Sequence, residues 1–288
     1  MSWIATAAGV LLIIVGFREV FFTLLRPLGR GRLTRVLAQS TWRALRRRAG
    51  TRVHAGPVIM VAVLSLWTVL QVLGWALLYL PFVPAGFAYS SGSPKGEYPR
   101  FVEALYISSV NLSTLGLGDV TPTALVVRVL SPLQALVGFG LLTAGVSWFL
   151  QTYPALGRRR ALAVRLAALS DASSLGELAR MNPVTSASLL HGLAADLAQV
   201  RVDLTQNSES YYFSEQDRRA SLPSMLPYAL AVARSGQRSH RSEVRIGGAA
   251  LEAVVSDLAA LLGEQFLKSK GPTDELLRQY GASHRPGE

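Results

Sequence analysis

The feature that most constrains this chain is a short stretch, residues 113–122, that reads S-T-L-G-L-G-D-V-T-P and lies between two long apolar segments. Its two glycines, Gly116 and Gly118, stand at alternate positions. Because glycine adopts positive φ without the steric cost that other residues incur, this spacing predicts a backbone that turns successive carbonyl oxygens to one side. The flanking segments, residues 57–82 and 124–150, are each long enough to cross a bilayer.

Such a row of oxygens can replace the water around a cation. Rings of carbonyl oxygens are a known way to carry a dehydrated ion through a membrane. One row per chain cannot enclose an ion, so the pattern requires four chains around an axis, a homotetramer. The preceding residues 101–112 can form a helix of about three turns, too short to span, which would re-enter the membrane and point its negative pole at the cation.

The residues of this region resemble those of a known family. The run T-L-G-L-G-D at residues 114–119 is similar to the T-V-G-Y-G-D signature of potassium channels, and A-L-Y at residues 104–106 is similar to the start of their pore helix. The resemblance covers residues 57–153. It implies a filter that holds K⁺ ions and no other metal or cofactor. The implied ion ligands are the carbonyls of Thr114, Leu115, Gly116 and Leu117 and the Thr114 hydroxyl, with Gly118 and Asp119 at the outer mouth.

The sequence departs from this family pattern behind the filter. Leu117 replaces the usual tyrosine, Ile107 replaces the second of the usual tryptophans, and Val110 stands where some members carry a glutamate. We therefore expect the filter to be supported from behind mainly by apolar packing. Potassium remains the expected ion, because two-pore-domain channels contain related filters with Leu or Phe at the position of Leu117.

The third apolar segment, residues 124–150, is the expected inner helix of the pore. Its glycines either form a gating hinge or permit close helix packing. Its terminal aromatic residues either form a hydrophobic gate or anchor the helix at the membrane interface. The hinge candidates are Gly138, Gly140 and Gly145. The gate candidates are Trp148, Phe149 and Tyr153. Residues expected to face a water-filled cavity are Ser131, Gln134, Thr143 and Ser147.

The charge distribution sets the expected topology. The 288 residues carry a formal net charge of +11, and nine arginines lie between Arg26 and Arg52 with no acidic residue among them. Arginines that flank apolar segments mark the cytoplasmic side. We expect the arginines from Arg26 to Arg52 and from Arg158 to Arg160 to meet anionic lipid, although a solvated linker without further role explains the first group equally well. Nucleic-acid binding is not expected, because no aromatic platform accompanies the charge.

Four segments follow from these patterns. Residues 1–25 form an N-terminal transmembrane helix, interrupted by Arg18 and Glu19, or else a helix lying on the cytoplasmic face. Residues 26–56 form a basic cytoplasmic linker, and residues 57–153 form the pore domain, in which Gln71, near the middle of the second apolar segment, must find a partner within the helix bundle or cost energy in lipid. Residues 84–100 form its outer loop. Residues 154–288 form a cytoplasmic helical domain, after a helix break at Tyr153, Pro154 and Gly157.

The C-terminal domain has helical spacing but no recognisable ligand motif. It lacks a nucleotide-binding fingerprint, a Walker lysine and a nucleophile elbow, and the chain contains no cysteine. Its regulatory ligand stays unknown. Helices are expected near residues 162–169, 175–180, 185–202, 226–233, 243–267 and 273–280.

The sequence thus predicts an all-α membrane protein. The predicted fold is a tetrameric pore-loop channel with an extra N-terminal transmembrane helix and a helical cytoplasmic domain. We expect passive potassium conduction in a bacterial plasma membrane, with gating by the C-terminal domain and no enzymatic step. The alternatives are a non-selective cation channel of the same fold and a receptor-like membrane anchor that does not conduct.

Overall fold

The structure, a computed structural model, describes residues 2–25, 31–46, 54–91, 96–172 and 181–284. The chain divides into two compact units. Unit 1 consists of Met1–Ser40 and Met60–Leu150, and unit 2 of Thr41–Ile59 and Gln151–Glu288. The segment limits expected at residues 25, 56 and 153 stay predictions.

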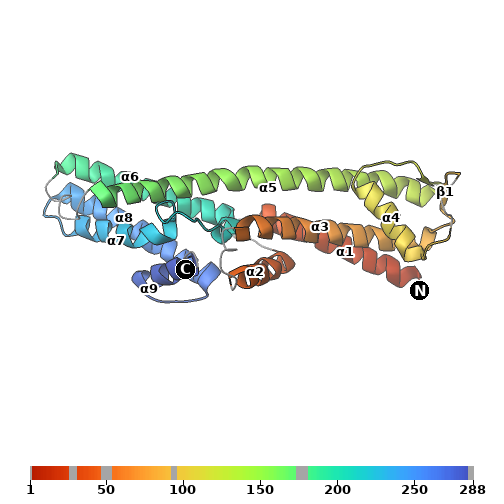
Figure 1. Ribbon diagram of the computed structural model, residues 1–288, viewed down its shortest axis with the longest axis horizontal. Coiled ribbons are helices and arrows are strands. Elements are labelled where there is room, and N and C mark those ends of the chain that lie inside the picture. Colours follow the sequence, from red (N-terminus) through yellow and green to blue (C-terminus); the bar gives the residue numbers. More distant parts are fainter. Residues whose placement is uncertain (1, 26–30, 47–53, 92–95, 173–180, 285–288) are drawn as a thin grey trace. The chain divides into compact units, whose positions relative to one another are not determined.

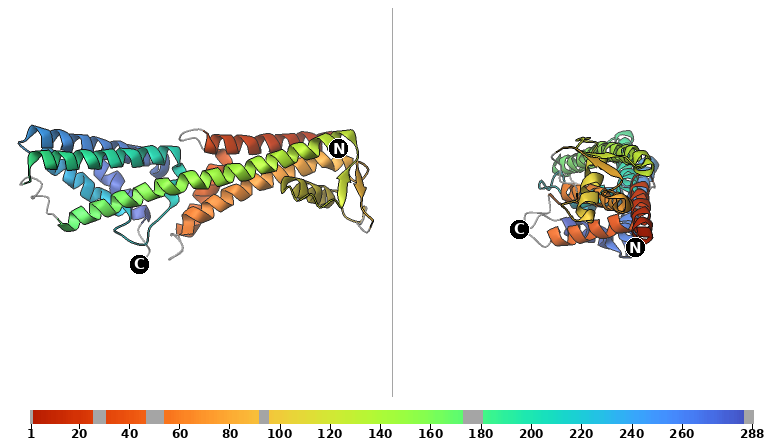
Figure 2. Two further views of the ribbon diagram at one scale, coloured as in Figure 1. Left: turned by 90° about the horizontal axis from the view of Figure 1, so that it is seen from above. Right: turned by 90° about the vertical axis from the view of Figure 1, so that its right-hand side faces the viewer.

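Unit 1 is helical apart from one small ribbon of two strands. The short helix α4 and both strands lie at the same end of this unit, beside the end of α3 and the start of α5 (Figures 1 and 2). Its elements are α1 (Ser2–Leu24), the first part of α2 (Arg32–Arg46), most of α3 (Ala55–Tyr79), the 3₁₀ turn η2 (Leu80–Phe82), β1 (Phe87–Tyr89), α4 (Arg100–Leu112), β2 (Val120–Pro122) and the first part of α5 (Leu125–Ala172).

Among the described residues, four helices are long and apolar enough to cross a membrane. They are Trp3–Leu24, Ala55–Phe82, Leu125–Ala172 and Ser242–Leu267. The first three correspond to the expected spans, so the all-α membrane fold is confirmed. The fourth lies in the tail, where the sequence predicts a helix but not a membrane span. Half of its most apolar window is buried inside the protein, compared with 22% for the first helix and 17% for the third.

Helices α1 and α3 pack closely because glycines face each other. A Cβ atom on Gly9 would lie 2.6 Å from the carbonyl oxygen of Gly74. Gln71 of α3 is buried, and its Nε2 donates to the carbonyl oxygen of Ile13 at 3.3 Å while its Oε1 accepts from Trp75 Nε1 at 3.2 Å. The expectation that Gln71 finds a partner within the bundle is confirmed.

Glu19 caps the start of α2. Its carboxylate is 3% exposed and accepts hydrogen bonds from the backbone N–H groups of Leu33, at 3.3 Å, and Thr34, at 2.9 Å. These are N–H groups of the first helical turn, which have no partner within the helix, and the positive pole of the helix dipole favours the carboxylate there. A Cβ atom on Gly31 would overlap the same carboxylate. A charge that is costly in an apolar helix therefore connects α1 to α2.

Helix α5 is continuous, and the break expected at Tyr153, Pro154 and Gly157 is wrong. Pro154 removes one backbone N–H, but the helix runs from Leu125 to Ala172. The residues that follow the proline, Ala155 and Leu156, are 3% and 1% exposed. Burial of Ala155 and Leu156 offsets the hydrogen bond that is lost at Pro154, and local sequence signals do not indicate this burial.

Unit 2 is a bundle in which α8 packs on α6 and α7 (Figure 1). Four of the helices expected in the tail are found as α6 to α9, and the segment expected at residues 162–169 is part of α5. The segment expected at 175–180 lies outside the described residues. The elements are α6 (Pro183–Gln206), the 3₁₀ turn η4 (Ser208–Tyr212), α7 (Leu222–Gln237), α8 (Ser242–Leu262), the π-helical turn η5 (Gly263–Leu267) and α9 (Thr273–His284).

The three consecutive arginines of α5 are fastened within unit 2. Arg158 pairs with Asp203 at 2.7 Å and Arg160 with Glu215 at 2.7 Å. Arg159 is 5% exposed and donates to the backbone carbonyls of Ser210 and Phe213 at 2.6 and 2.7 Å. The buried Arg159 is therefore not available to a lipid headgroup, contrary to the expectation for this group.

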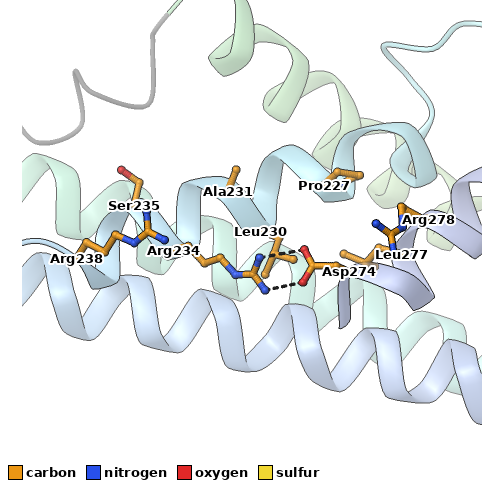
Figure 3. Close-up of a pocket in the computed structure, with 9 residues that line it drawn as sticks. All are labelled: Pro227, Leu230, Ala231, Arg234, Ser235, Arg238, Asp274, Leu277 and Arg278. Atoms are coloured by element: carbon orange, nitrogen blue, oxygen red, sulfur yellow. Dashed lines mark hydrogen bonds and ion pairs between the residues drawn. The ribbon is translucent and has the colours of Figure 1, made fainter. Parts of the chain in front are cut away.

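The aromatic residues of η4 fill the middle of unit 2. Tyr211 stacks on Phe266 with ring centroids 4.2 Å apart, and Trp42 lies 5.6 Å from the Tyr212 ring. Tyr211 and Tyr212 are 4% and 3% exposed. A second link in this unit joins α7 to α9, where Arg234 forms two hydrogen bonds with Asp274 (Figure 3).

The Glu19 cap makes a testable prediction for stability. Glu19→Ala should lower the free energy of unfolding by about 2 kcal/mol, because two N–H groups of α2 lose a charged acceptor. Glu19→Gln, which keeps one acceptor oxygen, should lose less. Thermal unfolding of the purified protein in detergent measures both. Equal stability of Glu19→Ala and the parent protein would contradict the cap.

Candidate functional site

The glycine-containing loop follows directly on α4. This helix has 13 residues, a length of about 20 Å, which is too short to cross the hydrocarbon layer. The N–H groups that leave the helix bond back to its last turn, from Ser113 to Ser109, from Thr114 to Asn111 and from Leu115 to Val110, at 3.0 to 3.2 Å. The start of the loop is thereby fixed to the end of the helix.

The loop backbone alternates in conformation. Positive φ occurs at Thr114 (57°), Gly116 (58°) and Gly118 (76°), and not at Leu115 or Leu117. A β-branched residue in this region costs about 1–3 kcal/mol, so Thr114 stores strain. A Cβ atom on either glycine would meet no atom of this chain within 4 Å, so backbone conformation and not space requires glycine here.

The carbonyl oxygens of this loop are available to a ligand. Among the described residues, none donates a hydrogen bond to the carbonyls of residues 114–118. Asp119 is the first residue of the loop whose carbonyl is used, accepting from the N–H of Ser90 at 2.9 Å. Residues 113–118 are all exposed in the single chain. The loop therefore presents unpaired oxygens in the segment that the sequence identified as a filter.

The outer end of the loop is tied by a residue whose role the sequence analysis missed. The hydroxyl of Tyr106 donates to Asp119 Oδ2 at 2.5 Å. The expectation of mainly apolar support behind the filter is therefore wrong at this point. In the sequence, Tyr106 belongs to the pore-helix motif A-L-Y, and no local pattern indicates that its hydroxyl reaches a carboxylate thirteen residues later.

Polar contacts also hold α4 against its neighbours. Ser108 Oγ donates to the carbonyl oxygen of Val72 at 2.8 Å, and Gln134 Nε2 donates to the carbonyl oxygen and hydroxyl of Ser108 at 2.9 and 2.8 Å. Asn111 Nδ2 lies 3.3 Å from Ser131 Oγ. These bonds attach the pore helix to both α3 and α5.

Two of the four residues that were expected to face a water-filled cavity are instead buried beside α4. Ser131 and Gln134 are 8% and 0% exposed and serve as partners of α4, so their expected contact with cavity water is wrong. Thr143 and Ser147 are exposed in the single chain. The helical spacing of polar residues does not distinguish a buried polar contact from a water-lined face, because both place polar residues on one side of an apolar helix.

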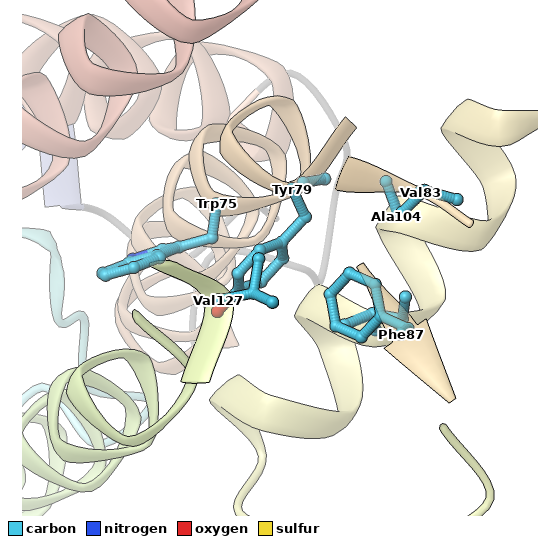
Figure 4. Close-up of a cluster of buried hydrophobic side chains, with 8 residues drawn as sticks. Trp75, Tyr79, Val83, Phe87, Ala104 and Val127 are labelled. Carbon is cyan, nitrogen blue, oxygen red and sulfur yellow. The ribbon is translucent and has the colours of Figure 1, made fainter. Parts of the chain in front are cut away.

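An apolar cluster joins α3, β1, α4 and α5 (Figure 4). Tyr79 lies 6.2 Å from the ring of Trp75 and meets Phe87 edge-on at 6.0 Å. Phe87 belongs to β1, which pairs with β2 in antiparallel register, Phe87 opposite Pro122. The ribbon thus connects the outer loop to the segment that follows the filter. The buried members are Trp75, Ala76, Tyr79, Val83, Phe87, Ala104, Ile107 and Val127.

A pocket of about 380 Å³ lies on the outer side of α4, beside the Tyr106 and Asp119 pair. Tyr89 and the buried Glu103 line it. Burial raises the pKa of the Tyr89 hydroxyl, and the neighbouring Glu103 carboxylate raises it further. Tyr89 therefore stays protonated at neutral pH. No group of three His, Cys, Asp or Glu side chains suited to a metal ion occurs within the described residues.

The three hinge candidates have different surroundings. A Cβ atom on Gly138 would overlap the carbonyl oxygen of Leu112, the last residue of α4. A Cβ on Gly145 would lie 3.1 Å from Leu64, and one on Gly140 would meet nothing within 4 Å. Gly138 thus permits close approach of α5 to the pore helix, the packing alternative. A hinge at these positions stays a prediction.

The gate candidates are also placed differently from one another. Trp148 is 2% exposed and packs on Trp67 with ring centroids 5.4 Å apart, which joins α5 to α3. Phe149 is partly exposed and lies 6.5 Å from the Trp148 ring. Tyr153 is 52% exposed. Of the three, Trp148 serves as a packing residue within unit 1, and a gate formed by these rings stays a prediction.

Comparison with known proteins agrees with this geometry. Residues 60–153 match a family described as "Ion channel". The pore region carries this family's sequence pattern. The matched residues run from α3 through α4 and the loop into α5, so the family resemblance expected from the filter motif is confirmed for this region. The match also supports a channel for cations.

One curated relative extends the comparison. The chain is 26% identical over 161 residues to "Uncharacterized membrane protein YdjJ" of Bacillus subtilis (strain 168). The alignment covers 54% of this chain and 46% of that protein, so the chain spans about half the length of the relative that it matches. No solved structure gives a significant match.

The contact of Gly138 makes a prediction about packing. Gly138→Ala should destabilise the protein by about 1–3 kcal/mol, because the new methyl group displaces the end of α4. Gly140→Ala is the matched control, since that position has open space in the chain and alanine favours a helix. Thermal unfolding compares the two. A Gly138→Ala variant as stable as Gly140→Ala would contradict the close approach.

The Tyr106 bond makes a second prediction. Tyr106→Phe removes one hydroxyl, and amide hydrogen exchange in residues 113–119 should accelerate about fivefold, as expected for the loss of one hydrogen bond. Tyr98→Phe, which alters an exposed tyrosine in the same pocket, should leave exchange unchanged. If both variants exchange like the parent protein, Tyr106 does not hold the loop.

Proposed function

We propose that this protein is the subunit of a homotetrameric channel that conducts potassium passively across a bacterial plasma membrane. The observation that carries the proposal is the filter backbone, in which positive φ alternates from Thr114 to Gly118 and the intervening carbonyls have no donor within the described chain. A row of such oxygens replaces the hydration shell of a cation.

The exposed surface of the filter supports the assembly of several copies. Leu115 and Leu117 are 65% and 59% exposed in the single chain, directly beside the unpaired carbonyls. Two large apolar side chains next to a polar backbone suit a contact with a neighbouring copy, and a closed ring of copies turns one row of oxygens into complete rings. Fourfold symmetry comes from the resemblance to potassium channels.

Potassium selectivity rests on the same resemblance. The proposed ion sites are formed by the carbonyls of residues 114–117 and the Thr114 hydroxyl, and Asp119 attracts cations at the outer mouth. The filter is held by Tyr106 and by the network on α4, so its oxygens keep a fixed spacing when an ion leaves. No covalent step is involved, in agreement with a family of channels and not of enzymes.

The topology follows the arginines. The basic residues that precede α3 and follow the pore lie on the cytoplasmic side, which places the filter mouth outside and unit 2 in the cytoplasm. Helix α2, residues 32–46, lies in the basic linker, and the arginines of this linker are proposed to meet anionic lipid. Unit 2 is proposed to gate the pore, because α5 belongs to both units.

A flux measurement tests the proposal. Purified protein in vesicles should release potassium, and Gly116→Ala should abolish the flux because alanine resists positive φ at the centre of the filter. The matched control is Gly96→Ala, which makes the same substitution at a glycine of similar φ (73°) in the outer loop and should retain the flux. Equal flux of sodium and potassium would indicate the non-selective alternative. No flux from the parent protein would indicate a non-conducting anchor.

A further inference from the structure

A pocket of unit 2 lies between α7 and α9. Its volume is about 520 Å³, within the range of small-molecule sites. Figure 3 shows that α7 contributes Arg234, that Arg238 directly follows this helix, and that α9 contributes Asp274 and Arg278. The aliphatic part of the lining includes Leu230 and Leu277, which are buried, together with Pro227 and Ala231. A charged rim and an apolar wall thus face the same space.

One of the three arginines is already neutralised. Arg234 donates to both carboxylate oxygens of Asp274 at 2.9 and 2.7 Å, and its Nε lies 3.3 Å from Glu252 Oε1. The hydrogen bond between Arg234 and Asp274 lowers the pKa of the Asp274 carboxylate and raises the pKa of the Arg234 guanidinium. This pair fixes one arginine and the only carboxylate of the pocket lining against each other.

The other two arginines keep their charge available. Within the described part of the chain, the side chains of Arg238 and Arg278 form no hydrogen bond or ion pair. Arg278 acts on Asp274 only through its charge. Both side chains are exposed, one directly after α7 and one on α9. Two guanidinium groups without a described partner therefore border the pocket together with Pro227 and Ala231, the more exposed aliphatic residues of its lining.

We infer that this pocket binds a small organic anion, a phosphate or carboxylate attached to an apolar group. Guanidinium groups bind both kinds of head group through paired, charge-assisted hydrogen bonds. The aliphatic lining favours an organic body over an inorganic ion, which would leave the wall in contact with water. The paired Arg234 and Asp274 form a rigid base between the two arginines. A soluble metabolite and a lipid head group share this chemistry.

Calorimetric titration of the purified full chain in a non-ionic detergent tests the inference without reference to conduction. Phenyl phosphate should bind, and inorganic phosphate should bind about tenfold more weakly, because it lacks the apolar group. The double variant Arg238→Gln, Arg278→Gln should lose about tenfold or more in affinity for phenyl phosphate. Arg245→Gln, at an exposed arginine of α8 outside the pocket, should bind like the parent protein.

A second variant separates loss of the site from loss of the fold. Ala231→Phe fills the pocket without changing its charge and should also abolish binding, while circular dichroism reports an intact helical fold. Dihexanoyl phosphatidic acid serves as the lipid arm: tighter binding than phenyl phosphate assigns a lipid source, and weaker or equal binding assigns a soluble one. The inference would be overturned if neither phenyl phosphate nor dihexanoyl phosphatidic acid binds, or if the double variant binds phenyl phosphate with unchanged affinity.

Discussion

The structure depends on a row of backbone oxygens that accept no hydrogen bond from any described residue of the chain. Burying an unpaired carbonyl costs free energy, and irregular backbone at membrane depth is tolerated only where it is shielded or lines water. The loop after α4 bonds the N–H groups of residues 113–115 to the helix and leaves the carbonyls of residues 114–118 for another partner. In the proposed tetramer that partner is a cation, and the remaining contacts of unit 1 serve to hold the loop still.

Those contacts act from three directions. Tyr106 holds the outer end through Asp119, Ser108 and Gln134 attach α4 to its neighbours, and Gly138 lets α5 approach the end of α4. Glu19 of α1 acts in a similar way, because its carboxylate accepts hydrogen bonds from two backbone N–H groups at the start of α2. The hydroxyl of Ser108, the Nε2 group of Gln134 and the carboxylate of Glu19 are each bonded to backbone or to another side chain, as expected for the interior of a helical membrane protein.

Features carried by local pattern could be predicted from the sequence. The alternating glycines Gly116 and Gly118 and the apolar segments around them indicated the loop, the short helix and the family. Features that depend on a distant partner could not. The sequence does not reveal that Tyr106 reaches Asp119, that Ser131 and Gln134 bond to α4, or that Arg159 is buried against carbonyls some fifty residues later, because in each case tertiary packing selects the partner. The continuation of α5 past Pro154 has the same origin.

The central claim is that carbonyl oxygens beside Gly116 and Gly118, contributed by four chains, select and conduct potassium. Recording the reversal potential of the purified protein in a planar bilayer, with potassium on one side and sodium on the other, tests it most directly. The account predicts currents that reverse near the potassium equilibrium potential. Currents that reverse at zero would contradict potassium selectivity, and protein that is shown to be inserted but carries no current under any ionic gradient would contradict conduction itself.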